Sequence, residues 1–155
     1  MDDIAQKAGL KRPLLYLLFR NKGDLLVAIF EHLVQGRPER AQKLIRTKGT
    51  KKARLMRMVE ILIIEPWERI SGHPHSPEFF ESCGIHNQEG YLRYEIHQQK
   101  IFADFFKEKT LAQVFCMALN GSLTDTPTPS TLRKRAQILV ERFSAASVPK
   151  KQLHD

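Results

Sequence analysis

Residues 3–33 are the part of this chain whose residue types and spacing indicate a specific chemistry, the recognition of DNA. Two short segments with apolar residues at helical spacing flank Gly9, which can take the positive φ of a sharp turn, and Ala5 leaves room for a neighbouring helix. Pro13 suits the first turn of the second segment, where a missing N–H costs no hydrogen bond. The pattern predicts a helix-turn-helix, whose second helix enters the major groove. An ordinary helical hairpin is the alternative.

The rest of the chain has helical periodicity interrupted by helix-breaking residues. The pattern runs over 24–46, where Gly36 and Pro38 are expected to bend or break the helix, and over 51–70, where Pro66 is expected to kink it. Asp2 or Asp3 is the expected N-cap of the first helix, and Thr110 is the expected N-cap of the helix predicted over 111–121. Further helices are predicted over 77–83, 91–107, 111–121 and about 131–146.

No strand-like alternation or repeat interrupts these helices, so the predicted fold class is all-α. We divide the chain into an N-terminal helix-turn-helix head at residues 1–23, a helical bundle at 24–147 and a tail at 148–155.

The excess of positive charge is confined to one segment. The chain has a net charge of +8, and the stretch from Arg37 to Arg57 contains nine Lys or Arg residues against the single acid Glu39. If residues 24–46 form one helix, its far end lies roughly 30 Å from the head. That separation exceeds the Debye length of about 8 Å. The segment is therefore predicted to be a solvated helix junction, with non-specific attraction to nucleic acid as the functional alternative.

Several function classes are disfavoured by what the sequence contains. No apolar run is long enough to span a bilayer, the first residues do not resemble a signal peptide, and Cys83 and Cys116 are too few for a disulfide framework, so we expect a cytoplasmic protein. Neither a glycine-rich phosphate loop nor a nucleophile elbow is present, so no enzyme is predicted. Zinc would need three or four converging ligands, and the loop residues His73 and His75, with Cys83 and His86 nearby, are more commonly solvated; no metal or cofactor is expected.

The N-terminal segment resembles the TetR (tetracycline-repressor-like) family of bacterial transcriptional regulators. The matching residues follow the order I-A-x-x-A-G-[hydrophobic] and then L-Y-x-x-F-x-x-K-x-x-L, and they are Ile4, Ala5, Ala8, Gly9, Leu10, Leu15, Tyr16, Phe19, Lys22, Leu25 and Leu26. The resemblance implies a ligand-responsive DNA-binding regulator, a repressor, that acts as a homodimer on a palindromic operator.

The resemblance also implies which residues face the duplex. The basic residues among them could neutralise phosphates, and Arg12 could instead reach a guanine edge. The three leucines replace the small, polar or aromatic residues usual in the family, and leucine can pack only on thymine methyls; alternatively, this run packs against another element. The positions carried over are Lys11, Arg12, Pro13, Leu14, Tyr16, Leu17, Leu18 and Lys22.

The family places another helix ahead of the first one seen here, packed across the turn. No such helix precedes Asp2. The sequence therefore suggests either a reading frame that starts upstream of Met1 or a degenerate head. If these residues were the whole protein, weak or absent operator binding would be expected.

In family terms, the helices at 111–121 and 131–146 form the dimer interface, and the central helices enclose a small apolar or aromatic inducer. Both faces of 111–121 are apolar or small, which is more than one monomer core needs, although a helix buried within one subunit would also fit. The expected pocket residues, each of which could instead be plain core, are Met56, Met58, Trp67, Phe79, Phe80, Cys83, His86, Tyr91, Tyr94, His97 and Phe102. The second hypothesis is a helical dimer that binds a ligand or partner but has a degenerate DNA-binding head.

Overall fold

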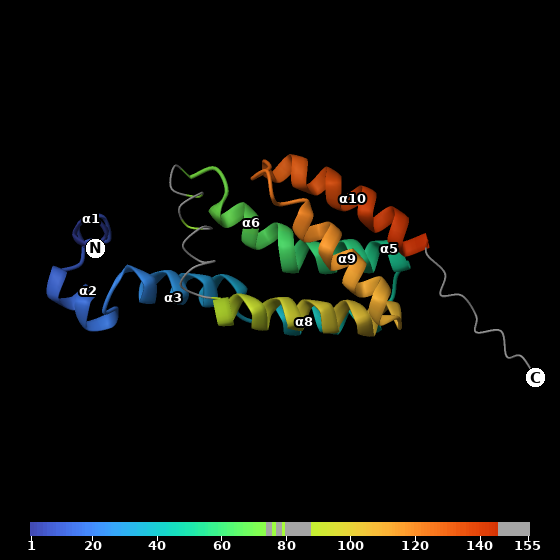
Figure 1. Cartoon of the computed structure of the whole chain (residues 1–155), viewed down its shortest axis with the longest axis horizontal. Coiled ribbons are helices and arrows are strands. Elements are labelled where there is room, and N and C mark those ends of the chain that lie inside the picture. The colour runs from blue at the N-terminus through green and yellow to red at the C-terminus, as the bar shows by residue number, and fades with distance from the viewer. Residues whose placement is uncertain (74–75, 77–78, 80–87, 146–155) are drawn as a thin grey trace, which may run out of the picture. The chain divides into compact units, whose positions relative to one another are not determined.

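Helices account for the regular structure of this chain, as the sequence predicts (Figure 1). The computed structural model describes residues 1–73, 76, 79 and 88–145, and none of these residues lies in a strand. The predicted short helix at 77–83 lies almost entirely outside the described residues. The elements are α1 (Asp2–Lys7), α2 (Arg12–Leu18), α3 (Lys22–Val34), α4 (Arg37–Lys43), η1 (Leu44–Arg46), α5 (Lys51–Val59), η2 (Glu60–Ile64), α6 (Glu65–Ile70), α8 (Gln88–Phe106), α9 (Lys109–Gly121) and α10 (Pro129–Ala145).

The chain divides into two compact units. The first consists of residues 1–35 and 73–94, and the second of residues 36–72 and the chain from 95 onward. The division falls at Gly36, which has a φ of +69° and separates α3 from α4. The predicted break at this glycine is therefore confirmed, because only glycine takes such a φ without steric cost.

The second unit has a core of interlocking apolar side chains. Helix α10 packs along α5, and Figure 1 shows these two helices side by side. Phe115 of α9 stands at the centre of an aromatic cluster, with its ring centroid 5.0 Å from that of Phe102 and 5.4 Å from that of Phe106, both edge-on. The largest fully buried side chains are Phe102, Phe115, Leu55, Met58, Leu62, Ile64, Ile101, Leu119, Leu132, Val59 and Val140.

The predicted irregularity at Pro66 takes the form of a π-helical segment, η2, between α5 and α6. The N–H of Glu65 bonds to the carbonyl of Glu60, five residues back. Pro66 has no N–H, so the Leu62 carbonyl four residues before it lacks its usual donor. The bond of the Glu65 N–H to Glu60 takes the usual donor from the Ile61 carbonyl. Side chains from other helices replace them: Arg37 Nη1 donates to the Ile61 carbonyl at 3.2 Å, and Gln98 Nε2 donates to the Leu62 carbonyl at 3.4 Å.

The basic segment does more than join helices. Arg37 is buried, with its side chain 5% exposed, and its Nη1 lies 2.6 Å from Glu65 Oε2. Arg40 and Arg57 approach the same carboxylate at 3.4 and 3.5 Å. The guanidinium of Arg54 donates to the Ile45 carbonyl at 2.6 Å. The prediction of a solvated junction is thus wrong for Arg37, because the carbonyls and carboxylate around Pro66 draw it into the core.

Helix α9 begins with a different cap from the one predicted. Its N-cap is Glu108, whose carboxylate accepts a hydrogen bond from the Thr110 N–H at 2.7 Å and another from the Leu111 N–H. The prediction of Thr110 as the cap is therefore wrong. A carboxylate at this position also interacts favourably with the positive end of the helix.

Replacing Arg37 with alanine is expected to lower the free energy of unfolding by about 3–5 kcal/mol, because it leaves buried acceptors without their donor. Arg40→Ala is the matched control: Arg40 contacts the same carboxylate but its side chain is 51% exposed. It should cost less than about 1 kcal/mol. Urea denaturation followed by circular dichroism measures both. Equal losses in the two variants would contradict a structural role for the burial of Arg37.

Candidate nucleic-acid interface

The turn between α1 and α2 is closed by two backbone hydrogen bonds. Gly9, with a φ of +66°, donates from its N–H to the Gln6 carbonyl at 3.1 Å, and the Leu10 N–H reaches the Ala5 carbonyl at 2.9 Å. This pair of bonds is the Schellman motif, which ends a helix at a left-handed residue. The predicted turn at Gly9 is confirmed, and it separates two helices that would otherwise run on.

Local signals also fix the starts of α2 and α3. Lys11 is the extended N-cap residue of α2, and Pro13 lies in the first turn, as predicted. In α3 the Asn21 side chain accepts from the Asp24 N–H at 2.9 Å. The Asp24 carboxylate in turn accepts from the backbone N–H of Arg20 at 3.2 Å. The two bonds are similar to a capping box, except that the returning bond comes from Arg20, one residue before the N-cap, and together they hold the link between the two helices.

Helix α2 packs against its neighbours through one buried side chain. Leu15 is 3% exposed and is the buried residue of α2, while Ala5, also 3% exposed, is that of α1. The two helices pack against each other. Anchoring through a single residue leaves most of the surface of α2 open to solvent.

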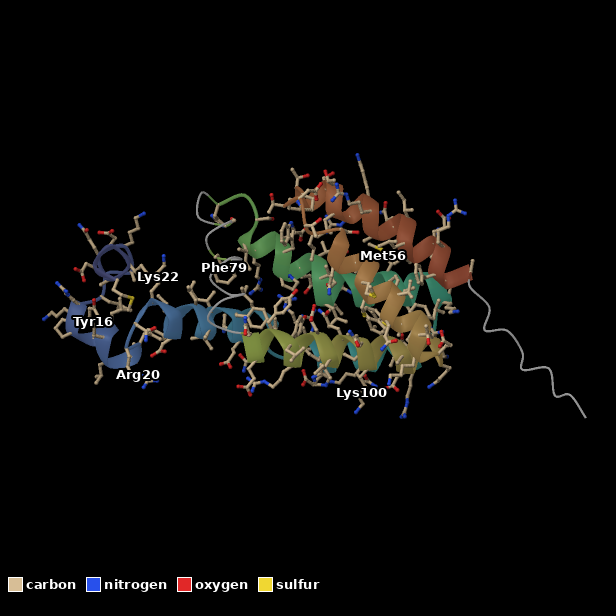
Figure 2. All side chains as sticks on the ribbon, viewed as in Figure 1. Tyr16, Arg20, Lys22, Met56, Phe79 and Lys100 are labelled. Carbon is tan, nitrogen blue, oxygen red and sulfur yellow. The ribbon has the colours of Figure 1, made fainter. Side chains whose placement is uncertain are left out.

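The eight residues predicted to contact DNA are all exposed. Figure 2 labels Tyr16 on α2 and Lys22 at the start of α3, together with Arg20 between the two helices. The predicted set is therefore accessible to a duplex. Its members are Lys11, Arg12, Pro13, Leu14, Tyr16, Leu17, Leu18 and Lys22.

Arg12 is held in place by two contacts within the helix-turn-helix. Its Nε lies 2.9 Å from Asp2 Oδ1, and its guanidinium carbon lies 5.5 Å from the centre of the Tyr16 ring. The predicted capping role of Asp2 or Asp3 is wrong, because the N-cap of α1 is Met1 without a side-chain bond. The carboxylate of Asp2 turns to Arg12 instead. Since both partners are more than half exposed, this ion pair is weak enough for a phosphate to replace the carboxylate.

Two further cations near α2 were missed by the sequence reasoning. Lys7 lies in the last turn of α1 and is exposed, and the Arg20 side chain is 90% exposed. Arg20 Nε also contacts Asp24 at 3.1 Å, so part of its charge is compensated. Arg20 could have been found from the sequence, because it is a basic residue directly before Asn21, the N-cap of α3. With these two residues, cations outnumber acids over residues 1–23.

The predicted pocket residues are distributed over both compact units. Met58 and Phe102 are fully buried in the core of the second unit, and Trp67 donates its indole N–H to the Pro127 carbonyl at 2.9 Å. His97 is exposed, and Tyr94 lies in the first unit with its ring 6.0 Å from that of Phe30. Phe79, labelled in Figure 2, is half-buried, as is Met56, and Tyr91 is 41% exposed. Phe80, Cys83 and His86 lie outside the described residues. The pocket stays a prediction.

Cys116 is a buried cysteine on α9. Burial, with a smaller contribution from the charge of Glu95, raises the pKa of its thiol to about 12. The thiol is therefore protonated at neutral pH and packs as a small apolar group.

The described part of the chain was also compared with the requirements of a metal site and of a membrane-spanning helix. Within it, no three His, Cys, Asp or Glu side chains gather closely enough to hold a metal ion. Over the same residues, no helix combines the length and apolar character that crossing a membrane requires.

The N-terminal part of the chain matches a known protein family. Residues 1–29 match the family model described as bacterial regulatory proteins, tetR family. The matched residues cover α1, α2 and the first part of α3. No curated protein and no solved structure matches the chain.

Removing the charge of Arg12 is expected to weaken binding to a fluorescent duplex of random sequence. Arg12→Ala should also reduce the slope of log affinity against log salt by about 1, because one phosphate contact is lost. Asp2→Asn should act in the opposite direction, since it removes the anion that competes for Arg12. Lys134→Ala on α10 removes an equal charge outside residues 1–29 and serves as the control. Fluorescence anisotropy at several salt concentrations measures all three, and an Arg12→Ala slope equal to that of the control would refute the contact.

Proposed function

We propose that this chain, a tetR-family regulator by its residues 1–29, is a ligand-responsive repressor that binds a palindromic operator as a homodimer. The family match supports DNA binding and transcriptional regulation. The observation that carries the proposal is the exposure of Arg12, Tyr16 and Lys22 around a helix anchored through Leu15 alone. These residues supply phosphate and base contacts, and a cytoplasmic location is part of the same proposal.

The homodimer is proposed from apolar side chains that the second unit leaves in solvent. Val114 and Met117 on α9 are 48% and 71% exposed, and Ile138 on α10 is 62% exposed. Phe115, on the opposite face of α9, is fully buried. Helices α9 and α10 pack on each other, so they can offer one combined apolar surface to a second copy. A two-fold interface of this kind suits operator half-sites spaced by one helical turn or a multiple of it.

Ligand response is the part of the proposal that depends on the family resemblance. Aromatic and apolar side chains in the second unit, such as Met58, Trp67 and Phe102, suit a small apolar or aromatic molecule. Such a ligand would act by population shift, stabilising a spacing of the two heads that does not fit the operator.

A second candidate function is favoured by the exposed leucines of α2. In that case the chain is a dimeric helical protein that binds a ligand or partner, and its head no longer recognises DNA. The two candidates differ in whether α2 selects a DNA sequence.

Selection from a pool of random duplexes tests the proposed function. Low salt strengthens the electrostatic part of binding, so it should reveal even a weak preference. We expect the 155-residue chain to enrich a sequence with two-fold symmetry, with protected half-sites one or more helical turns apart in a footprint. Failure to enrich any sequence over repeated rounds would favour the partner-binding alternative. Enrichment of an asymmetric site would retain DNA recognition but contradict the two-fold dimer.

Met117→Lys tests the dimer. A charge placed on a side chain that is 71% exposed should leave the fold intact but oppose burial against a second copy. We expect sedimentation velocity to show a shift from dimer to monomer. Ile96→Lys provides the control, because Ile96 is 58% exposed on α8, outside the proposed interface. A dimer that persists in Met117→Lys and is lost in the control would place the interface elsewhere.

A further inference from the structure

Three leucines on α2 are exposed side by side with the cations of the helix-turn-helix. Leu17 is 81% exposed, Leu18 60% and Leu14 44%. Leucines with this exposure keep apolar area in contact with water, at about 25 cal/mol per Å². These leucines lie next to exposed cations of the helix-turn-helix. A partner that covers both would carry negative charge beside an apolar group.

The helical geometry of α2 places Leu17 on the side away from the protein and the other two leucines on one flank of the helix. Successive residues turn by about 100° around the axis, so Leu17 lies almost opposite the buried Leu15. Leu14 and Leu18 are neighbours at i and i+4 on one flank of Leu17. Arg12 and Tyr16 form the other i, i+4 pair, whose contact the structure shows. Helix α2 therefore carries apolar side chains at its outermost position and along one flank. The other flank carries the cation of Arg12 and the hydroxyl of Tyr16.

Duplex DNA has a feature that matches such a surface. A leucine side chain has neither donor nor acceptor, and the apolar group that the major groove offers is the C5-methyl of thymine. The cations around α2 match the phosphates on the rims of the groove, and this charge complementarity favours nucleic acid over a purely apolar protein surface as the occupant. Duplex DNA therefore matches both the positive charge and the apolar side chains of this surface.

We infer that Leu14, Leu17 and Leu18 determine sequence specificity by packing on the methyl groups of thymines at the centre of each operator half-site. The inference rests on the proposed function, because it requires α2 to enter the major groove. Leu17 makes the central contact, and Arg12 on the other flank binds a phosphate at the rim of the groove. Sequence preference thus comes mainly from shape and methyl position in the leucine-facing bases.

Replacement of thymine by deoxyuridine in the enriched duplex removes the methyl group and keeps every hydrogen-bonding atom. At each thymine under the leucines, we expect affinity for the wild-type chain to fall about fourfold, the equivalent of one methylene-sized apolar contact. In Leu17→Ala the same replacement should have no effect at the thymine that Leu17 contacts. This loss of coupling in a double-mutant cycle identifies the contact.

Leu92→Ala is the matched control, since Leu92 is a 55% exposed leucine on α8, beyond residues 1–29. It should keep the full sensitivity to deoxyuridine. Enrichment of a sequence whose affinity is indifferent to deoxyuridine at every thymine would overturn the inference while leaving the proposed function standing. No enrichment at all would overturn both. Loss of self-association in Leu17→Ala, measured by sedimentation with unchanged DNA affinity, would assign the leucines to a protein contact and also refute the inference.

Discussion

The absent N–H of Pro66 is the constraint around which the second compact unit is built. Together with the π-helical bond from Glu65 to Glu60, it leaves the carbonyls of Ile61 and Leu62 in need of donors in an environment where unsatisfied acceptors cost free energy. Arg37 of α4 and Gln98 of α8 provide those donors, so one irregular turn ties together three separate parts of the unit. The π-helical segment therefore acts as a meeting point of helices rather than as a defect.

The burial of Arg37 follows from the same constraint. A guanidinium has five donors in a planar fork, which lets it serve the Ile61 carbonyl and the Glu65 carboxylate together. Glu65 also lies near Arg40 and Arg57, so a single acid partly compensates several cations of the most basic segment. Because Arg37 directly follows Gly36, the ion pair fixes the first turn of the second unit immediately after the division between the units.

The helix-turn-helix is organised by different forces. Its turn and helix starts are set by backbone and side-chain hydrogen bonds among near neighbours, from the Schellman bonds at Gly9 to the bonds that Asn21 accepts from Asp24 and Asp24 accepts from Arg20. Little apolar surface is buried there, since α1 and α2 each contribute one buried residue. Such a region keeps its outer side chains exposed, as the proposed binding to DNA requires.

Local sequence determined the parts of this protein that depend on near neighbours: the helical character of the described residues, the turn at Gly9, the proline in the first turn of α2, the break at Gly36 and the match of residues 1–29 to a family model. These follow from φ preferences and short-range periodicity, which the sequence displays directly. Only the tertiary structure decided that Arg37 is buried, that Asp2 pairs with Arg12 instead of capping α1, and that the lost bonds at Pro66 are replaced from α4 and α8. The physical reason is that each of these choices is a competition between partners distant along the chain, and their relative positions exist only once the helices have packed.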